Sequence, residues 1–235
     1  MRKVLTFIGT GSAFSKENLS NSAYYLKEDK LVLFDCGETI FHEIRRLNLI
    51  NEKIKKIDII ITHLHSDHSG SLGSLILYCN KMQLQEINVI FPIKDMIYAL
   101  LNLFGVPKNI YNTKTPDEIS DYYLQSFEQV HGCVSKDGLV ERMPSYGYHF
   151  INDNDNLFYS GDTTIIQENI LQMFKEKKIY YLYQDITINN NKSHLPLNEL
   201  EKLIDKKYRH RIMCMHLEDD ANIKQIKELG FNTSR

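Results

Sequence analysis

The stretch ITHLHSDHSG, residues 61–70, carries three histidines and an aspartate within six positions: His63, His65, Asp67 and His68. It continues the apolar run IDIIIT, residues 57–62, which predicts a strand buried on both faces. Side chains two positions apart on extended backbone point the same way, so His63 and His65 should share one side. Asp67 and His68 come where a helix is expected to begin. Imidazole and carboxylate groups suit zinc, so the stretch predicts ligands for one or two metal ions.

The composition of the chain argues against several other classes of protein, among them nucleic-acid coats, membrane proteins and disulfide-rich secreted proteins. The chain has 235 residues, 43% of them hydrophobic, and a formal net charge of −2, which gives no electrostatic basis for coating nucleic acid or a membrane surface. No apolar run approaches the ~20 residues of a membrane span, and the opening MRKVLTFIGTGSAF predicts a strand and a turn instead of an export signal. Four cysteines without a C-x-x-C pair argue against a disulfide framework and fit a reducing cytoplasm.

Strand-like and helical segments alternate along the chain, which predicts a layered α/β protein with mixed sheets. The early part is rich in hairpins, and later strands are separated by helices. One predicted helix, TIFHEIRRLNL at residues 39–49, places Ile40, Ile44 and Leu47 on one face. The segment 105–123 has turn residues and tyrosines without strong periodicity. We expect it to pack near the functional site or a dimer contact, or to be a plain surface connection.

At this point the sequence resembles a known family. HLHSDH matches the H-x-H-x-D-H signature of the metallo-β-lactamase superfamily. FIGTGSAF resembles the first strand and glycine turn of that family, and LVLFDCGE the segment with a structural aspartate. QVHG, FYSGDT and MCMHL follow in the family's order, so the resemblance covers nearly the whole chain. The GTGSA opening and the YSGDT form of the aspartate motif are most similar to the ribonuclease-Z branch of phosphodiesterases.

The resemblance implies a four-layer αββα sandwich with two mixed sheets, formed by residues 1–235 as a single domain. It implies two Zn²⁺ ions, with Mn²⁺ or Fe²⁺ as alternatives. Carried over position by position, the first ion would take His63, His65 and His131, the second Asp67, His68 and His216, and Asp162 would bridge them. Two such ions ~3.5–4 Å apart lower the pKa of a shared water towards ~7 and clamp a phosphoryl oxygen. A bridging acid reduces their mutual repulsion.

Several other residues have expected roles. Ser193-His194-Leu195 resembles the place of a histidine that assists the leaving group, and Asp185 resembles its carboxylate partner, although Gln184 replaces a histidine of the family motif. An Asp185–His194 pair would keep the imidazole protonated near neutral pH. We therefore assign His194 and Asp185 to catalysis, together with Asp67. Asp35 is expected to support a metal loop more than to bind metal itself. His42 and His210 are expected on the surface, and His149 inside a strand.

The resemblance leaves the substrate open. True tRNA 3′-processing enzymes insert a long arm between the third metal histidine and the bridging aspartate, whereas here residues 132–161 contain mostly a predicted hairpin and GCVSKDGLVERMPS. A small phosphodiester fits better, most of all a cyclic mononucleotide, as in the compact phage anti-Pycsar nucleases. The alternatives are a ribonuclease-Z-type tRNA endonuclease and an inactive metal-binding module. The resemblance further implies a homodimer in the cytoplasm, of the host if the chain is phage-encoded, with no membrane partner and with nucleic acid less expected.

Overall fold

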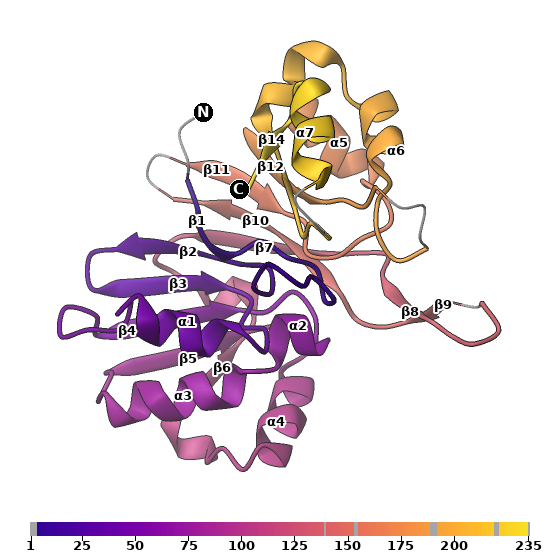
Figure 1. Ribbon diagram of the computed structural model, residues 1–235. Coiled ribbons are helices and arrows are strands. Elements are labelled where there is room, and N and C mark those ends of the chain that lie inside the picture. The colour runs from indigo at the N-terminus through magenta and orange to yellow at the C-terminus, as the bar shows by residue number, and fades with distance from the viewer. Residues whose placement is uncertain (1–3, 139, 153–154, 189–191, 219–220, 235) are drawn as a thin grey trace. The chain divides into compact units, whose positions relative to one another are not determined.

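The computed structural model describes residues 4–138, 140–152, 155–188, 192–218 and 221–234 (Figure 1). The chain divides into two compact units. The N-terminal unit consists of Lys3–Gly9 and Leu19–Ile119, and the C-terminal unit of Met1–Arg2, Thr10–Asn18 and Ser120–Arg235. Each contains a six-stranded mixed sheet with helices. The prediction of an α/β protein with two mixed sheets is thereby confirmed. None of the described helices has the length and hydropathy of a membrane span.

The N-terminal unit begins with a β-meander and continues with strands separated by helices. Its elements are β1 (Thr6–Gly9), β2 (Ser22–Lys27), β3 (Lys30–Phe34), α1 (Ile40–Arg46), β4 (Lys56–Ile60), α2 (Ser66–Ser69), α3 (Leu72–Lys81), β5 (Glu86–Ile90), α4 (Lys94–Leu103), the 3-10 turns η1 (Lys108–Ile110) and η2 (Pro116–Glu118), and β6 (Asn112–Lys114). The sheet runs β1-β2-β3-β4-β5-β6, and β3 to β6 are parallel. The carboxyl ends of β3 and β4 therefore meet at one edge, which carries Asp35 and His63.

The predicted strand before the histidine stretch is confirmed as β4. Its apolar side chains are buried on both faces, as expected for the interior of a parallel sheet. Asp58 is the one charged residue buried within it, and its carboxylate accepts hydrogen bonds from Lys30 Nζ at 3.1 Å and Asn88 Nδ2 at 2.7 Å. These contacts connect β4 to both neighbouring strands, β3 and β5, ahead of the histidine stretch.

The C-terminal unit has the same chain order, with antiparallel strands before the parallel ones. Its elements are β7 (Tyr123–Glu128), β8 (Gly132–Val134), β9 (Val140–Arg142), β10 (Tyr146–Ile151), β11 (Asn156–Tyr159), α5 (Glu168–Lys175), β12 (Tyr181–Asp185), α6 (Leu197–Leu203), the 3-10 helix η3 (Lys206–Arg211), β13 (Ile212–Met215), α7 (Ala221–Glu228) and β14 (Asn232–Thr233). The sheet runs β14-β13-β12-β11-β10-β7. Since β10 is antiparallel to both β7 and β11, the carboxyl ends of β7, β11, β12 and β13 share one edge.

One apolar cluster stabilises the C-terminal unit. Phe158, Leu182 and Ile212 on the central strands pack with Phe174 of α5 and Ile226 of α7, and all are buried. Burial of side chains this large contributes about 1.5–3 kcal/mol each. The cluster fixes the strands whose ends carry the functional side chains.

Two local predictions differ from the structure. Helix α1 ends at Arg46, and Leu47 is 42% exposed instead of lying on the buried face with Ile40 and Ile44. The chain turns away at Asn48, whose φ is +51°. Residues 132–142, for which no element was expected, form the hairpin β8–β9, which Figure 1 shows extending from the C-terminal unit. The segment 105–123 includes the edge strand β6, paired with β5.

Candidate metal centre

In the N-terminal unit, His63 and His65 face each other as their spacing predicts. His63 Nε2 and His65 Nδ1 lie 3.0 Å apart. Two nitrogens on one tetrahedral zinc, with bonds of about 2.0–2.1 Å, lie about 3.3 Å apart, so this pair fits a shared ion. His63 is fully buried, which holds its ring in one orientation.

The short helix α2 carries the other two candidate ligands. Asp67 and His68 are both buried, and His68 Nε2 lies 3.2 Å from Asp67 Oδ2. The imidazole nitrogen and the carboxylate oxygen therefore converge as two ligands of one ion would. The amide of His68 donates to the His65 carbonyl at 3.0 Å, so the helix backbone ties this pair to the preceding one.

Asp35, at the end of β3, supports the histidines from behind. Its Oδ2 lies 2.9 Å from His68 Nδ1, and its Oδ1 accepts a hydrogen bond from the Thr62 amide at 2.8 Å. Thr62 Oγ1 is 3.1 Å from His63 Nδ1, which extends the same support to the first pair. Burial raises the pKa of the Asp35 carboxyl, against the lowering influence of His68 and Thr62. Asp35 thus contacts Nδ1 of a candidate ligand, the position from which a carboxylate can orient a metal-binding histidine.

Gly37 lets the Asp35 loop approach the backbone of α2. A Cβ at Gly37 would overlap the carbonyl oxygen of Asp67. Three backbone hydrogen bonds hold the two segments together: Cys36 N to His68 O at 2.8 Å, Glu38 N to Ser66 O at 3.1 Å, and Ser71 N to Cys36 O at 3.1 Å. Helix α2, which carries Asp67 and His68, is therefore positioned by a close backbone contact at residue 37 that only glycine permits.

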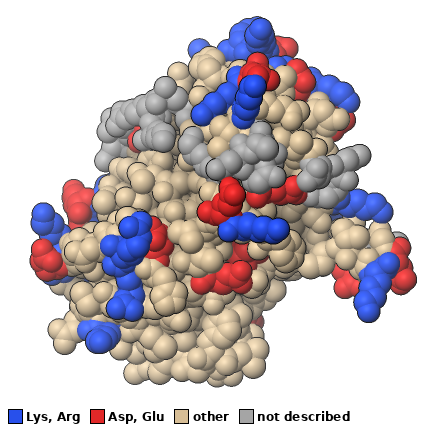
Figure 2. Space-filling model, viewed as in Figure 1, with Lys and Arg blue, Asp and Glu red and all other residues tan. Residues whose placement is uncertain are grey.

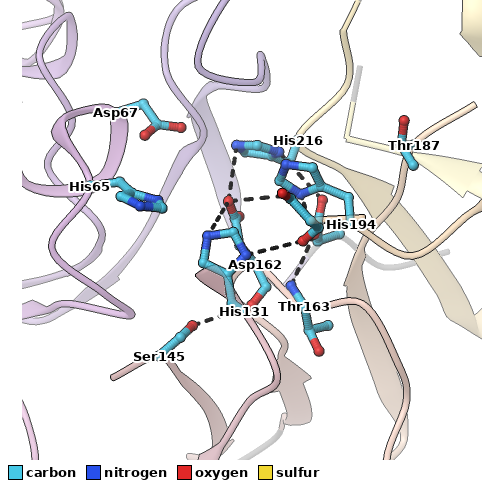
Figure 3. Close-up of polar contacts among 12 residues, drawn as sticks. His65, Asp67, His131, Ser145, Asp162, Thr163, Thr187, His194 and His216 are labelled. Atoms are coloured by element: carbon cyan, nitrogen blue, oxygen red, sulfur yellow. Dashed lines mark hydrogen bonds and ion pairs between the residues drawn. The ribbon is translucent and has the colours of Figure 1, made fainter. Parts of the chain in front are cut away.

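In the C-terminal unit, candidate residues follow the four strand ends that share an edge. His131 follows β7, Asp162 follows β11, Asp185 ends β12 and His216 follows β13. Asp162 Oδ2 lies 3.6 Å from His216 Nε2 and 3.8 Å from His131 Nε2. Figure 3 shows the two rings directed at this carboxylate. The topology of the sheet thus gathers residues that are far apart in sequence.

Asp185 contacts more than its expected partner. One oxygen, Oδ2, lies 2.8 Å from His194 Nδ1 and accepts a hydrogen bond from the Thr163 amide at 3.0 Å. The other, Oδ1, lies 3.3 Å from Nδ1 of His216. Burial alone would raise the pKa of Asp185, but the charge of His194 and the hydrogen bonds from His194 and His216 outweigh it and hold the pKa below its usual range. The contact with His216 was not predicted, because the pairing depends on β12 and β13 being neighbours.

His194 is half-buried on the segment between β12 and α6. Burial lowers its pKa, but the nearby carboxylates Asp185 and Asp162 more than compensate, so the pKa lies above the ordinary value. The neighbouring carbonyl of Ser193 lies 3.0 Å from His131 Nδ1, which links this segment to a candidate ligand. Asp162, Asp185, His194 and His216 can each bring one ligand atom within 4.8 Å of the others. By distance alone His194 could therefore bind metal, and a metal assay of a variant separates that role from catalysis.

The remaining histidines lie as the sequence predicted. His42 and His210 are exposed. His149 is buried in β10, where its Nε2 lies 2.9 Å from Asn156 Oδ1. Sequence reasoning missed the supporting contacts of Thr62, Thr163 and the Ser193 carbonyl. Thr62 could have been found, since it directly precedes the histidine stretch, whereas the other two act through backbone groups that leave no signal in the sequence.

Comparison with solved structures identifies the fold. YhfI of Bacillus subtilis, a metallo-β-lactamase fold protein, superposes with a TM-score of 0.71 at 13% identity, covering 97% of this chain and 94% of its own. A diphosphatase of the PhnP family gives a TM-score of 0.74 at 18% identity, covering 97% and 93%. The chain therefore has the metallo-β-lactamase fold, as predicted. Its two sets of histidines and aspartates are candidate ligands for a divalent metal within that fold.

Sequence comparison identifies the family of this chain within the metallo-β-lactamase fold. The profile of the family described as anti-Pycsar protein Apyc1 matches residues 3–233, and the chain belongs to that family. One relative, the anti-Pycsar protein Apyc1 of Bacillus phage 010DV004, is 28% identical over 237 residues, which cover 92% of this chain and 89% of the relative. The predicted resemblance to the anti-Pycsar nucleases is confirmed.

Proposed function

We propose that the protein is a two-zinc phosphodiesterase that hydrolyses cyclic mononucleotides. The observation that carries the proposal is made in both units: a buried carboxylate lies against Nδ1 of a candidate ligand histidine. Asp35 Oδ2 is 2.9 Å from Nδ1 of His68, and Asp185 Oδ1 is 3.3 Å from Nδ1 of His216. Metal-binding histidines are commonly held in this way, because a carboxylate on one ring nitrogen orients the other nitrogen and makes it more basic. Membership of the anti-Pycsar family supports the choice of substrate.

The proposed ligand sets are those implied by the resemblance. One ion would be held by His63, His65 and His131, the other by Asp67, His68 and His216, and Asp162 would be shared between them. When bound, such a pair of ions supplies a water of lowered pKa and stabilises negative charge on the phosphoryl oxygens. Contacts within the N-terminal unit support these sets, since His63 with His65, and Asp67 with His68, converge at 3.0 and 3.2 Å.

His194 is proposed to serve the leaving group. As water attacks phosphorus and the bond from phosphorus to the sugar oxygen breaks, the departing oxygen gains negative charge. His194 has Nδ1 engaged by Asp185, so Nε2 is the nitrogen that would transfer a proton to that oxygen. Asp185 orients the ring and stabilises its charged form. The product is then a ring-opened nucleotide with a neutral hydroxyl.

The size of the segment between His131 and Asp162 supports a small substrate. Much of it consists of the hairpin β8–β9 and the strands β10 and β11. No separate domain that could grip a tRNA body occurs among the described residues of this segment. Binding of tRNA depends on many phosphate contacts, which a chain of net charge −2 does not favour.

Product analysis tests the proposed substrate. The purified protein is incubated with cyclic mononucleotides, cyclic dinucleotides and a tRNA precursor, and products are identified by mass spectrometry. Linear mononucleotides are the expected result. Cleavage of the tRNA precursor alone would assign a ribonuclease-Z-type activity, and no turnover of any substrate by the metal-loaded protein would indicate an inactive metal-binding module.

Elemental analysis tests the ligand sets and the identity of the metal. We expect about two zinc ions per chain, with Mn²⁺ or Fe²⁺ as the alternatives. His63→Ala should lose metal and activity, while His42→Ala, at an exposed histidine of α1, should keep both. Full metal occupancy in His63→Ala would contradict the assignment.

A homodimer in the cytoplasm is proposed as the working form. Figure 2 shows few charged side chains over α3 and α4 of the N-terminal unit. The exposed residues there include Leu77, Leu103 and Phe104, and Phe104 adjoins Gly73 of α3. A surface of this kind suits burial against a second copy. Light scattering should give the dimer mass at micromolar concentration, and Leu103→Lys should shift it to the monomer. A monomer mass for the wild type would reject the dimer.

A further inference from the structure

A fully exposed aromatic residue lies on the loop Thr10–Asn18 of the C-terminal unit. Phe14 is 95% exposed, the highest value among the large hydrophobic side chains of the described residues. A single exposed apolar residue is common on proteins. The position of Phe14 is informative because backbone hydrogen bonds hold its loop against the residue that follows His216.

The loop is fixed to the chain beside a candidate metal ligand. The amide of Leu217 donates to the Thr10 carbonyl at 2.9 Å, and the amide of Ser12 donates to the Leu217 carbonyl at 3.1 Å. These bonds enclose Gly11, which forms a β-bridge with Leu217. Leu217 directly follows His216, so the loop is anchored one residue from a proposed zinc ligand.

The turn that carries Phe14 is ordered by its own contacts. The amide of Ser15 donates to the Ser12 carbonyl at 3.1 Å, which closes a β-turn with Phe14 in its third position. Ser15 Oγ also accepts a hydrogen bond from the Asn18 amide at 3.3 Å. An apolar side chain with almost no contacts is thus presented on a backbone that is held in place, which is how binding loops are commonly built.

The chain itself limits the distance from Phe14 to the metal site. Two residues span at most about 7 Å, so Phe14 cannot lie far from Ser12 and its bond to Leu217. In a cyclic nucleotide the base is separated from phosphorus by one sugar. The chain thus keeps Phe14 in the neighbourhood of His216, and we take this neighbourhood as the region where the base of a metal-bound cyclic nucleotide would lie.

We propose that Phe14 supplies the face on which the nucleobase of the substrate stacks. The proposal rests on the proposed hydrolysis of cyclic nucleotides and adds the residue that binds the base. A phenyl ring has no hydrogen-bonding group, so it accepts every base and contributes affinity without strict base selection. Purines, with the larger ring system, should gain more from it than pyrimidines.

Kinetics and binding of Phe14 variants test this role. Base stacking is worth about 5- to 150-fold in affinity. Phe14→Ala should raise KM for cyclic nucleotides by a factor in that range with kcat nearly unchanged, while Phe14→Tyr and Phe14→Trp should stay near the wild type. Calorimetry with a slowly cleaved phosphorothioate cyclic nucleotide should show the same loss in Kd. Leu26→Ala, at a residue of β2 that is 47% exposed, is the control.

The outcomes separate this inference from the proposed function. Wild-type protein that hydrolyses cyclic nucleotides, with Phe14→Ala at the same KM and Kd, would overturn the role of Phe14 alone. Wild-type protein that hydrolyses and binds none of them would overturn both. Unchanged KM together with a changed oligomeric mass in Phe14→Ala would assign the ring to contact with a second copy instead.

Discussion

His194 is the residue at which metal binding and catalysis can be separated. We expect His194→Ala to retain both metals and the fold while losing about 10²–10⁴-fold in turnover of cyclic nucleotides, the usual range for a general acid. The loss should shrink with p-nitrophenyl esters, whose leaving group needs no proton. Elemental analysis and kcat on both substrates are the measurements. Loss of a metal in this variant would make His194 a ligand, and unchanged turnover would give the acid role to another group.

Asp185 should affect two histidines at once. Asp185→Asn removes the charge that holds His194 Nδ1 and also alters the contact with His216 Nδ1. We therefore expect a smaller loss of turnover than in His194→Ala, together with metal affinity lowered by about 10- to 100-fold. Titration with a metal-binding dye measures the affinity. Wild-type metal affinity in Asp185→Asn would show that His216 is oriented without it.

At the scale of elements, the position of helix α2 depends on Gly37, which lies in the segment after β3. Gly37→Ala should displace the backbone at Asp67 and lower metal affinity at least as much as the loss of a supporting carboxylate, about 10- to 100-fold. Gly138→Ala is the control for backbone strain alone, since φ there is +75° and an added Cβ meets only Lys192 Nζ at 3.7 Å, outside the proposed ligand set. The measurement is the metal content after dialysis. Full metal content in Gly37→Ala would show that the segment around Gly37 can shift without displacing Asp67.

Strand β10 contains a histidine that should make stability depend on pH. Burial lowers the pKa of His149, which a contact with Asn156 only partly offsets. As pH falls below about 6.5, the unfolded chain takes up a proton that the folded chain resists, so stability falls from about pH 7 towards pH 5. His149→Gln should flatten the dependence of Tm on pH in this range, and His42→Gln should not. Equal slopes in wild type and His149→Gln would refute the assignment.

At the scale of elements, strongly patterned segments were predictable and weakly patterned ones were not. The run 57–62 and the sequence HLHSDH predicted β4, the facing pair His63 and His65, and the start of α2. The strands β8 and β9 were missed because each has three residues, most of them exposed, and so lacks apolar alternation. Leu47 was misplaced because a helix end depends on the local turn at Asn48 more than on periodicity.

For the whole molecule, the single-domain expectation for residues 1–235 stays a prediction, and metal removal tests it. Because the proposed ligand sets draw on both units, bound metal should make them unfold together. Metal that binds only the folded chain at 100 times its Kd stabilises by about 2.7 kcal/mol, so chelation should lower Tm by roughly 5–10 °C. Hydrogen exchange should show the N-terminal unit (residues 4–9 and 19–119) and the C-terminal unit (residues 10–18 and 120–234) losing protection together in the metal-bound protein. Separate transitions in that protein would contradict a single domain.

The sequence by itself determined which stretch carries the candidate metal ligands and how strands and helices alternate, and its resemblance to a known family implied the class of reaction. The first two depend on residue type and close spacing, which local geometry turns into structure directly. Only the tertiary structure decided which distant residues act together. Asp35 reaches His68 because β3 and β4 are parallel neighbours, and Asp185 reaches both His194 and His216 because β12 lies beside β13. Such contacts arise from strand order and from a backbone approach that Gly37 permits, neither of which is recorded in the spacing of residues along the chain.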